Sequence, residues 1–549
     1  MSRYRRPAVG VPVGTERVFR RSDVAIHAVL SVVLLLSVLV FARYWFSQGD
    51  WSRTPVVFTL MTVPLFAGLC AYGARWVLMP LMRRPIHRQP SRGWRVGVAT
   101  TFVPSAEPME MLEQSVAAMV ALDYPHDTWV LDEGDDPKVR ALCARLGAKH
   151  FSRHGVKAYQ ADSGRFERRT KHGNYNAWLD AVGYERYHLV VNFDPDHVPE
   201  PTFLARTLGY FDDERIAYVQ AAQVYYNQPA SFVARGAAEE TYAYYSSVQM
   251  TSYALGYPIV TGCHTAQRVT ALQQVGGFAA HEADDLLITI YYRVAGWAGV
   301  YVPEVLATGI TPVDWDGYLT QQRRWARSVL DVKFRIYLKV ARRLSPVERV
   351  TSLAHGLYYL HGLASALAVG LLAVLLITFT APAVLSWQTI PYALVLIAAL
   401  QLCEVFRQRF FLRRSERGLH WRAGLLRAAK WPVVLVALFE ALRPRDWAYS
   451  LTRKTKGRTA SHLLVVPHLL VAATLLGAFV LGTLLGHHRE PAVVSAALLA
   501  ALQSLALVLT SLRTWPAPFD AALRDRAALE VVSKFVELRW RRPDVIRRR

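Results

Sequence analysis

The sequence is poor in charged residues and in cysteine, and both shortages exclude classes of protein. Only 19% of the 549 residues are charged, whereas 52% are hydrophobic, which excludes an intrinsically disordered or fibrous chain. The four cysteines are scattered, without a CxxC pair or metal-site spacing, so no disulfide framework is expected. No glycine-rich dinucleotide fingerprint or P-loop follows an expected strand, which disfavours a Rossmann dehydrogenase and a nucleoside triphosphatase.

The chain is rich, however, in long apolar runs that carry few charges. A helix needs about 20 apolar residues to cross a bilayer. Six segments meet that length and are the expected spans: 24–46, 55–80, 352–380, 387–404, 461–486 and 492–512. A further run at 422–443 carries recurring charges and Pro432. From its residues alone it is either a seventh span or a helix at the membrane interface, and we favour the interface.

The distribution of basic residues predicts the orientation of the chain. The net charge is +22, and arginines concentrate within 3–21, 83–95 and 547–549, whereas the loops expected on the other side are short and carry few. Because basic loops stay in the cytoplasm, an even number of spans places both termini and the large polar domain there. The charge therefore predicts attraction to anionic membrane lipid, and no nucleic-acid partner is expected.

The polar stretch 95–335 alternates short apolar runs with segments of helical periodicity. This alternation indicates an open α/β sheet, in which ligands bind beyond the carboxyl ends of the strands. Two acidic clusters follow such runs, namely Asp132 with Glu133 and Asp194 with Asp196. Asp194 and Asp196 are candidate ligands of Mg²⁺ or Mn²⁺, although aspartate is also an ordinary turn residue.

Two further motifs have both a structural and a functional interpretation. Asp284 and Asp285 precede a helical run, where acids either stabilise the helix N-terminus or supply a general base. The segment QQRRWARS at 321–328 either forms an amphipathic interfacial helix or sets an arginine against a phosphate and a tryptophan against a sugar. Composition alone favours the interfacial helix.

Taken in order between the spans, these motifs resemble the processive family 2 glycosyltransferases of the cellulose synthase type. The resemblance covers residues 95–460. It rests on VLDEG (130–134), KHGNYN (171–176), FDPDH (193–197), TGCHTAQR (261–268), EADDLLITIYYRVAGW (282–297), QQRRW (321–325) and YSLTRK (449–454). Two departures are notable: ADD stands where the family has TED, and the PilZ signature is absent, so no c-di-GMP site is expected on this chain.

The resemblance implies a role for each motif. Asp285 would be the general base that activates the acceptor hydroxyl. The nucleotide-sugar would contact Asp132, Glu133, Lys171, Asp194, Gln321, Arg324, Thr452 and Lys454, and the acceptor would contact Trp325, Cys263, His264 and Asp284. Asp194 and Asp196 would hold Mg²⁺ or Mn²⁺ on the diphosphate of a UDP-sugar, with UDP-glucose favoured. Because the gating segment 449–454 must share a side with the active site, the resemblance also assigns 422–443 to the interface.

The expected fold is an α/β GT-A type glycosyltransferase domain inserted in an α-helical transmembrane bundle of about six spans. The expected organisation is a cytoplasmic basic tail (1–23), two spans (24–80), the glycosyltransferase domain (95–335), an interfacial helix (336–351), two spans (352–404), interfacial helices with the gating loop (405–460), two spans (461–512) and a basic tail (513–549).

The expected activity is inverting, processive synthesis of a β-linked polysaccharide, a cellulose-like glucan first, with export through the chain's own channel. The expected contacts are the UDP-sugar, the growing polysaccharide, membrane lipid and a periplasmic or cell-envelope partner. One alternative is a non-processive family 2 transferase that acts on a lipid-linked acceptor. An alternative of another class is a membrane transporter or channel subunit without catalysis, which is disfavoured because the charges lie mostly outside the spans.

Overall fold

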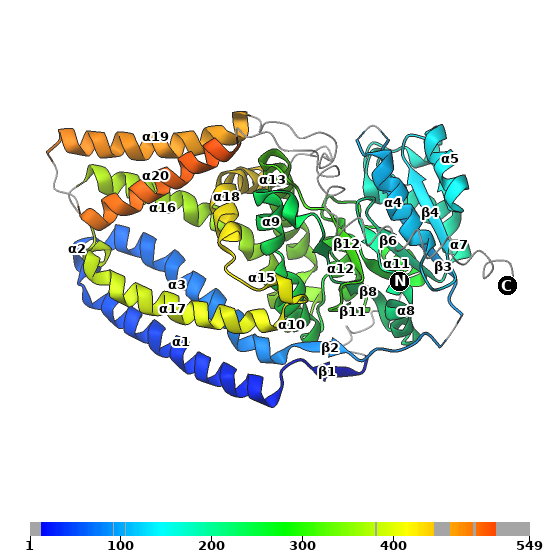
Figure 1. Ribbon diagram of the computed structural model, residues 1–549, viewed down its shortest axis with the longest axis horizontal. Coiled ribbons are helices and arrows are strands. Elements are labelled where there is room, and N and C mark those ends of the chain that lie inside the picture. The colour runs from blue at the N-terminus through cyan, green and yellow to red at the C-terminus, as the bar shows by residue number, and fades with distance from the viewer. Residues whose placement is uncertain are drawn as a thin grey trace.

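The computed structural model describes residues 13–91, 93–104, 106–378, 381–443, 462–486 and 490–511. It has two parts that lie side by side (Figure 1): a bundle of long helices and an α/β domain. The segment predicted to form the gating loop, 449–454, with Thr452 and Lys454, lies outside the described residues, as does the C-terminal tail from 512.

Within the described ranges, six helical segments are long and apolar enough to cross a membrane. They comprise α1 (Arg21–Ser47), α3 (Pro55–Leu78), the consecutive α15 (Pro346–Leu357) and α16 (His361–Ile377), α17 (Ile390–Arg407), α19 (His462–Leu484) and α20 (Pro491–Ser511), and the short α2 (Asp50–Arg53) lies between the first two. Apolar side chains stand exposed on their outer faces, for example Leu35 on α1 and Leu394 on α17, each at 58%. Such a surface suits hydrocarbon rather than water.

The third of these segments begins earlier than the sequence predicts, at Pro346 rather than at 352. Ser345 and Glu348 form a capping box, in which the Ser345 amide donates to Glu348 (2.8 Å) and the Glu348 amide to the Ser345 hydroxyl (3.3 Å). Proline in the first turn also favours a helix start. The interfacial helix expected over 336–351 is therefore divided, because α14 (Leu338–Val340) and a 3₁₀ turn end before this cap.

The α/β domain is built on a seven-stranded mixed sheet. Its strands are β3 (Val96–Phe102), β4 (Asp127–Asp132), β5 (Lys149–Phe151), β6 (Leu189–Phe193), β8 (Ile216–Ala221), β10 (Thr265–Arg268) and β11 (Ala298–Val302), in the order β11-β8-β10-β6-β3-β4-β5. Successive side chains on a strand alternate between faces. Accordingly Val191 belongs to the core on one face and Val190 to the core on the other, so helices cover both faces.

The remaining elements surround this sheet. Its helices are α4 (Met109–Val120), α5 (Pro137–Leu146), α6 (Lys171–Trp178), α7 (Tyr184–Arg186), α8 (Phe203–Thr207), α9 (Phe232–Glu239), α10 (Gln249–Ala254), α11 (Val269–Val275), α12 (Asp284–Val294) and α13 (Trp315–Asp331). Strands β7 (Val198–Pro199), β12 (Ala307–Gly309) and β9 (Val224–Tyr225) form a small sheet, and β1 (Thr15–Arg17) pairs with β2 (Arg83–Pro85).

The strand directions decide which loops meet. Strands β3, β4 and β6 are parallel, so their carboxyl ends share one edge of the sheet. Strand β10 runs antiparallel to β6, with Thr265 opposite Asn192. The residues just before β10 therefore lie beside those just after β6, and segment 261–264 meets segment 194–197 at this edge.

The ambiguous stretch forms one helix, α18 (Trp421–Leu442), with Pro432 inside it. It lies at the junction of the two parts (Figure 1) and packs against α9, α13 and α16. Its charges have partners there: the Lys430 ammonium donates to the carboxylate oxygens of Glu240 at 2.8 and 3.0 Å, and Glu440 pairs with Arg323. The charges that interrupt this apolar run thus attach the helix to the α/β domain.

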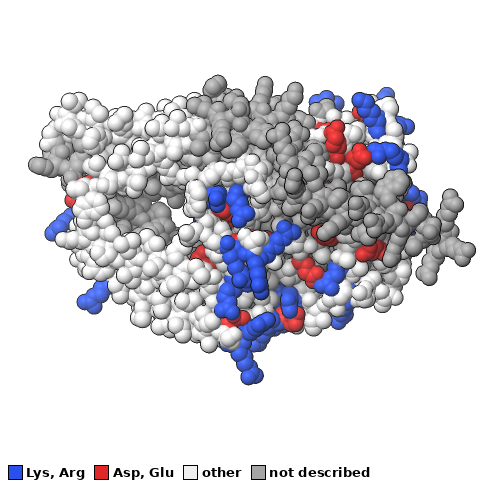
Figure 2. Space-filling model, viewed as in Figure 1, with Lys and Arg blue, Asp and Glu red and all other residues white. Residues whose placement is uncertain are grey.

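Basic side chains gather where the two parts meet. In Figure 2 the surface of the helical bundle is almost uncharged, and lysines and arginines form a cluster beside it, toward the α/β domain. The predicted asymmetry of charge along the bundle is therefore visible on this face of the molecule.

Candidate functional site

A cavity of about 1860 Å³ lies between the α/β domain and the helical bundle. Its domain wall includes Asp194, Asp285 and Trp325, and its far wall includes Gly68 of α3 and Gln401 of α17. Residues of α15 and α18 close the sides. The cavity therefore connects the edge of the sheet with helices that are apolar enough to cross a membrane.

Asp194 and Asp196 follow β6 at the sheet edge, and both line the cavity. One ligand atom from each of them and one from His197 lie within 4.8 Å of one another. Carboxylate oxygens at this spacing are the donors that Mg²⁺ and Mn²⁺ prefer. The donor set therefore fits a hard divalent cation, although the role of either aspartate as a ligand stays a prediction.

Lys171 begins α6 and extends into the same group of acids. Its ammonium donates to Asp194 Oδ1 (2.5 Å) and to the carbonyl oxygen of Gly262 (2.7 Å). Burial alone would lower the pKa of Lys171, but the carboxylates of Asp194 and Asp284 outweigh it and raise the pKa well above its usual value. The lysine is thus a fixed positive charge on the cavity wall.

Asp284 and Asp285 are the first two residues of α12, and both line the cavity. Burial raises the pKa of both carboxyl groups, that of Asp284 to about 7. The amide of Leu286 donates to Asp285 Oδ1 (2.7 Å), and the other carboxylate oxygen of Asp285 faces Gly262, where an added Cβ would lie 3.3 Å away. A carboxylate held in this way, with a raised pKa, can accept a proton at neutral pH.

Helix α13 carries the QQRRW motif along the cavity. Gln321, Arg324 and Trp325 all line it, and Trp325 is 37% exposed there. One turn later, Arg327 donates to both carboxylate oxygens of Glu282 at 2.8 and 2.7 Å. Because Glu282 lies two residues before Asp284, this ion pair ties the segment that leads into α12 to α13.

The two acids at the end of β4, Asp132 and Glu133, have different surroundings. Asp132 is completely buried, and its carboxylate accepts from the amides of Gly134 (2.9 Å) and Asp136 (2.6 Å). Its side chain closes its own loop and is not among the cavity-lining residues of the described chain. Glu133 does line the cavity and pairs with the buried guanidinium of Arg153 at 2.9 and 3.0 Å. The predicted contact of Asp132 with a nucleotide stays untested.

Cys263 and His264 are likewise placed differently from the other predicted residues. They lie just before β10 and are 2% and 0% exposed. Their side chains contact His197. Among the described residues, neither of them belongs to the cavity lining. Their predicted role as acceptor contacts therefore gains no support from this geometry.

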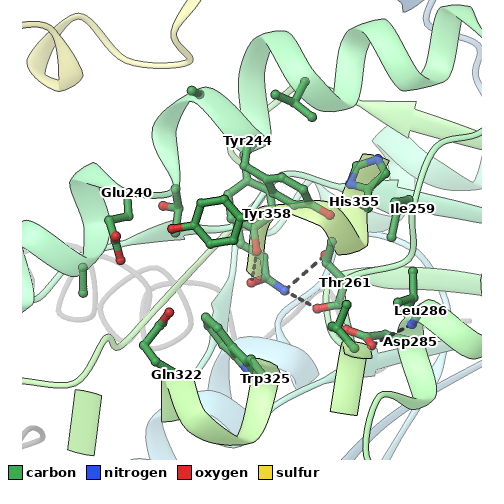
Figure 3. Close-up of a pocket in the computed structure, with 18 of the residues that line it drawn as sticks. Glu240, Tyr244, Ile259, Thr261, Asp285, Leu286, Gln322, Trp325, His355 and Tyr358 are labelled. Atoms are coloured by element: carbon green, nitrogen blue, oxygen red, sulfur yellow. Dashed lines mark hydrogen bonds between the residues drawn. The ribbon is translucent and has the colours of Figure 1, made fainter. Parts of the chain in front are cut away.

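Several lining residues were not identified from the sequence. Figure 3 shows Tyr244 and Tyr358 across the pocket from Trp325, with Glu240 facing Gln322 and Asp285 at one end. Of these, Gln322 belongs to α13, whereas Glu240 and Tyr244 follow α9 and Tyr358 follows α15. The sequence did hint at Glu240. The basic residues inside the apolar run 422–443 require acidic partners, and Lys430 of that run pairs with Glu240.

Comparisons with known proteins find sequence similarity to glycosyltransferases. Residues 97–328 match the family model described as glycosyltransferase like family 2. Cellulose synthase 1 of Komagataeibacter xylinus and that of Novacetimonas hansenii are each 26% identical over 330 residues. The aligned part is 58% of this chain, and the chain spans only 20% of the length of those relatives.

Among solved structures, glucosyl-3-phosphoglycerate synthase of Mycobacterium tuberculosis, in complex with Mn²⁺, UDP-glucose and phosphoglyceric acid, is 14% identical with a TM-score of 0.31. The match covers 43% of this chain and 78% of that one.

Proposed function

We propose that this chain polymerises a β-linked glycan from a UDP-sugar and passes it through its own helical bundle. Residues 97–328 match the family 2 glycosyltransferase model, and the chain is similar to cellulose synthases. The predicted fold class, a GT-A type glycosyltransferase domain combined with a bundle of apolar helices, is confirmed. The sugar, the processivity and the export are the parts that we propose. A glucan is favoured because the named relatives are cellulose synthases.

The donor diphosphate would bind at the end of β6. Asp194 and Asp196 would hold Mg²⁺ or Mn²⁺, which when bound offsets the negative charge that grows on the leaving UDP. Lys171, whose ammonium is fixed between Asp194 and Gly262, would add a positive charge at the same place. Arg324 of α13, which also lines the cavity, would contact the phosphates as a second positive charge.

Asp285 would remove the proton from the acceptor hydroxyl, which then attacks the anomeric carbon from the side opposite the leaving UDP and inverts its configuration. Its buried position and raised pKa make it a stronger base than an exposed aspartate. The face of Trp325 would support the terminal sugar of the acceptor. Arg327, through Glu282, would keep the start of α12 in place without touching either substrate.

The observation that carries the proposal is the continuity of the cavity. The acids of the sheet edge and residues of α3, α15 and α17 line the same space. A polymer extended at Asp285 and Trp325 would have the helical bundle directly ahead of it. The cluster of basic side chains beside the bundle (Figure 2) supports a cytoplasmic position for the domain, because basic surface stays on the cytoplasmic side.

The test uses the purified full chain in lipid nanodiscs with Mg²⁺ or Mn²⁺ and each radiolabelled UDP-sugar in turn. We expect UDP-glucose to give a long product that is degraded by a β-glucan-specific hydrolase. Asp285→Asn should abolish synthesis while UDP still binds. Asp180→Asn, at an exposed aspartate paired with Arg165, is the matched control and should keep wild-type activity.

Product length separates this proposal from the alternatives. A short product attached to lipid would show a non-processive transferase, and no incorporation with any UDP-sugar would remove the proposed activity. Synthesis at the wild-type rate by Asp285→Asn would contradict the assignment of the base.

A further inference from the structure

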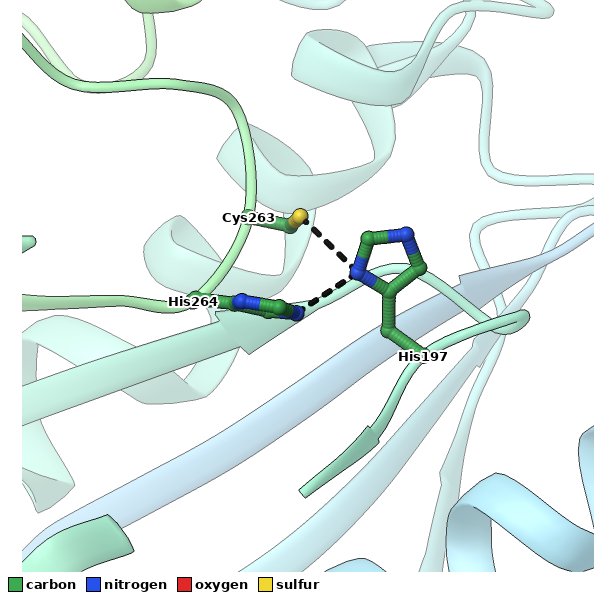
Figure 4. A group of neighbouring side chains, drawn as sticks. All are labelled: His197, Cys263 and His264. Carbon is green, nitrogen blue, oxygen red and sulfur yellow. Dashed lines mark hydrogen bonds between the residues drawn. The ribbon is translucent and has the colours of Figure 1, made fainter. Parts of the chain in front are cut away.

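Beside the carboxylates of the donor site lies a second cluster of side chains, made of His197, Cys263 and His264 (Figure 4). His197 Nδ1 lies 2.6 Å from His264 Nε2 and 3.2 Å from Cys263 Sγ. All three residues are buried, with exposures between 0% and 5%. Three ligand atoms, one sulfur and two imidazole nitrogens, therefore converge on one point in the interior.

The strand pairing explains why they meet. His197 follows β6, and Cys263 and His264 precede β10, which runs antiparallel to β6. His264 has a left-handed backbone, with φ of 57°, a conformation that is uncommon for a non-glycine residue and concentrates at functional sites. Gly309 leaves room for the His197 ring, because a Cβ there would lie 2.2 Å from its Nε2.

We propose that His197, Cys263 and His264 form a binding site for a zinc-class cation, separate from the hard-cation site of Asp194 and Asp196. Thiolate and imidazole are the ligands that Zn²⁺ prefers, whereas Mg²⁺ and Mn²⁺ prefer oxygen. Three protein ligands leave the fourth tetrahedral position for water. Binding of a cation at this cluster does not depend on the proposed glycosyltransferase activity, so each proposal can be tested without the other.

The partners of the three side chains are those that metal ligands require. A ligating histidine usually donates its other ring N–H to a carbonyl or faces a carboxylate. Here His264 Nδ1 donates to the carbonyl oxygen of Ala222 (3.1 Å), which leaves Nε2 with its lone pair, and His197 Nε2 lies 4.0 Å from Asp196 Oδ1. The Gln223 amide donates to Cys263 Sγ at 2.8 Å, a bond that stabilises a thiolate.

The spacing is close to that of an occupied site. Zinc bond lengths in a tetrahedral site imply separations of about 3.3 Å between two nitrogens and about 3.6 Å between nitrogen and sulfur. The observed distances of 2.6 and 3.2 Å therefore need to widen by only about 0.4–0.7 Å. An ion can arrive from the cavity, because His197 and Gln223 both line it.

Such a site would fix the loop after β6. The cation would join His197 to the segment before β10, and the other ring nitrogen of His197, Nε2, lies 4.0 Å from Asp196 Oδ1. The soft site would therefore act as a positioning element for the donor-side carboxylates rather than as a participant in sugar transfer.

The test is a Co²⁺ titration of the full chain in nanodiscs, stripped with a chelator and then supplied with excess Mg²⁺. We expect a thiolate-to-cobalt charge-transfer absorption that saturates at one Co²⁺ per chain and disappears when Zn²⁺ is added. Cys263→Ser should abolish the band. Cys143→Ser, at another buried cysteine, on α5, is the control and should keep it.

Zinc X-ray absorption of the wild-type chain gives a second measurement that does not depend on a variant folding. The proposal predicts one sulfur and two imidazole nitrogens around the ion. A wild-type titration without a thiolate band, a band that survives Cys263→Ser, or a zinc shell of oxygen and nitrogen alone would each overturn it. Glycosyltransferase activity is not among these measurements, so its absence would bear only on the proposed function.

Discussion

The buried ion pair between Arg293 and Glu348 joins the helix of the proposed base to the first turn of a membrane helix. Arg293 lies on α12 and Glu348 on α15, and their side chains are only 2% and 3% exposed. Nε of Arg293 donates to Glu348 Oε1 (2.5 Å), and its Nη1 donates to the carbonyl oxygen of Trp297 (2.6 Å). The pair is therefore a direct connection between the catalytic domain and the bundle.

Removing one partner should be costly. Arg293→Met leaves the Glu348 carboxylate buried without its countercharge, which destabilises a protein by about 3–5 kcal/mol. For a domain of this size that corresponds to a fall in Tm of roughly 6–20 °C. The double variant Arg293→Met with Glu348→Gln should recover at least about 2 kcal/mol, because no charge remains buried and glutamine still accepts from the Ser345 amide.

The assay is thermal unfolding of the full chain in nanodiscs for the wild type, both single variants and the double variant. Arg145→Met is the matched control, since its pair with Glu113 is exposed (58% and 43%) and its loss should leave the Tm close to that of the wild type. A loss of under about 1 kcal/mol for Arg293→Met, or a double variant as unstable as the sum of the singles, would refute the reasoning.

Three further predictions concern the site and its support. The pKa of Asp284 is raised in the native state, which therefore holds a proton that the unfolded state releases near pH 4. The free energy of unfolding should consequently fall as the pH rises from about 4 to about 7. Asp284→Asn should flatten that pH profile in unfolding measurements. Arg327→Gln should lower kcat by roughly ten- to a hundredfold with little change in the KM for the donor, and an equal loss in kcat/KM through KM alone would contradict its role in holding Glu282. Gly173→Ala should destabilise the domain by about 1–3 kcal/mol, because a Cβ there would lie 2.1 Å from the Glu167 carbonyl oxygen, whereas Gly370→Ala, with open space around it, should leave stability unchanged or higher.

Much of the architecture followed from pattern alone. Six long apolar runs predicted six helices of membrane length, and alternating strand and helix periodicity predicted the α/β domain between them. Acids at strand ends and at a helix start predicted which carboxylates meet, and Asp194, Asp196, Asp284 and Asp285 do line one cavity. These inferences succeed because strand ends and helix starts are defined locally, and the edge of a sheet collects them.

What the sequence could not predict depends on contacts between distant segments. Asp132 also ends a strand, yet its carboxylate turns inward to the amides of its own loop. Cys263 and His264 face His197 because β10 runs antiparallel to β6, a pairing that periodicity does not specify. The charges of α18 led us to expect an interfacial helix, but the sequence did not indicate their partners, which are Glu240 just after α9 and Arg323 of α13.

The position of α18 has a consequence for how the molecule works over a reaction cycle. This helix packs against α9 and α13 of the α/β domain and against α16 of the bundle. Its contacts with the α/β domain include the ion pairs Lys430–Glu240, which is buried, and Glu440–Arg323, which is half-buried. Sliding one half past the other would separate those charges inside the protein, at a cost of several kcal/mol. In the proposed polymerisation, advance of the product by one sugar would therefore come from small local rearrangements around the cavity, while the two halves keep their relative position.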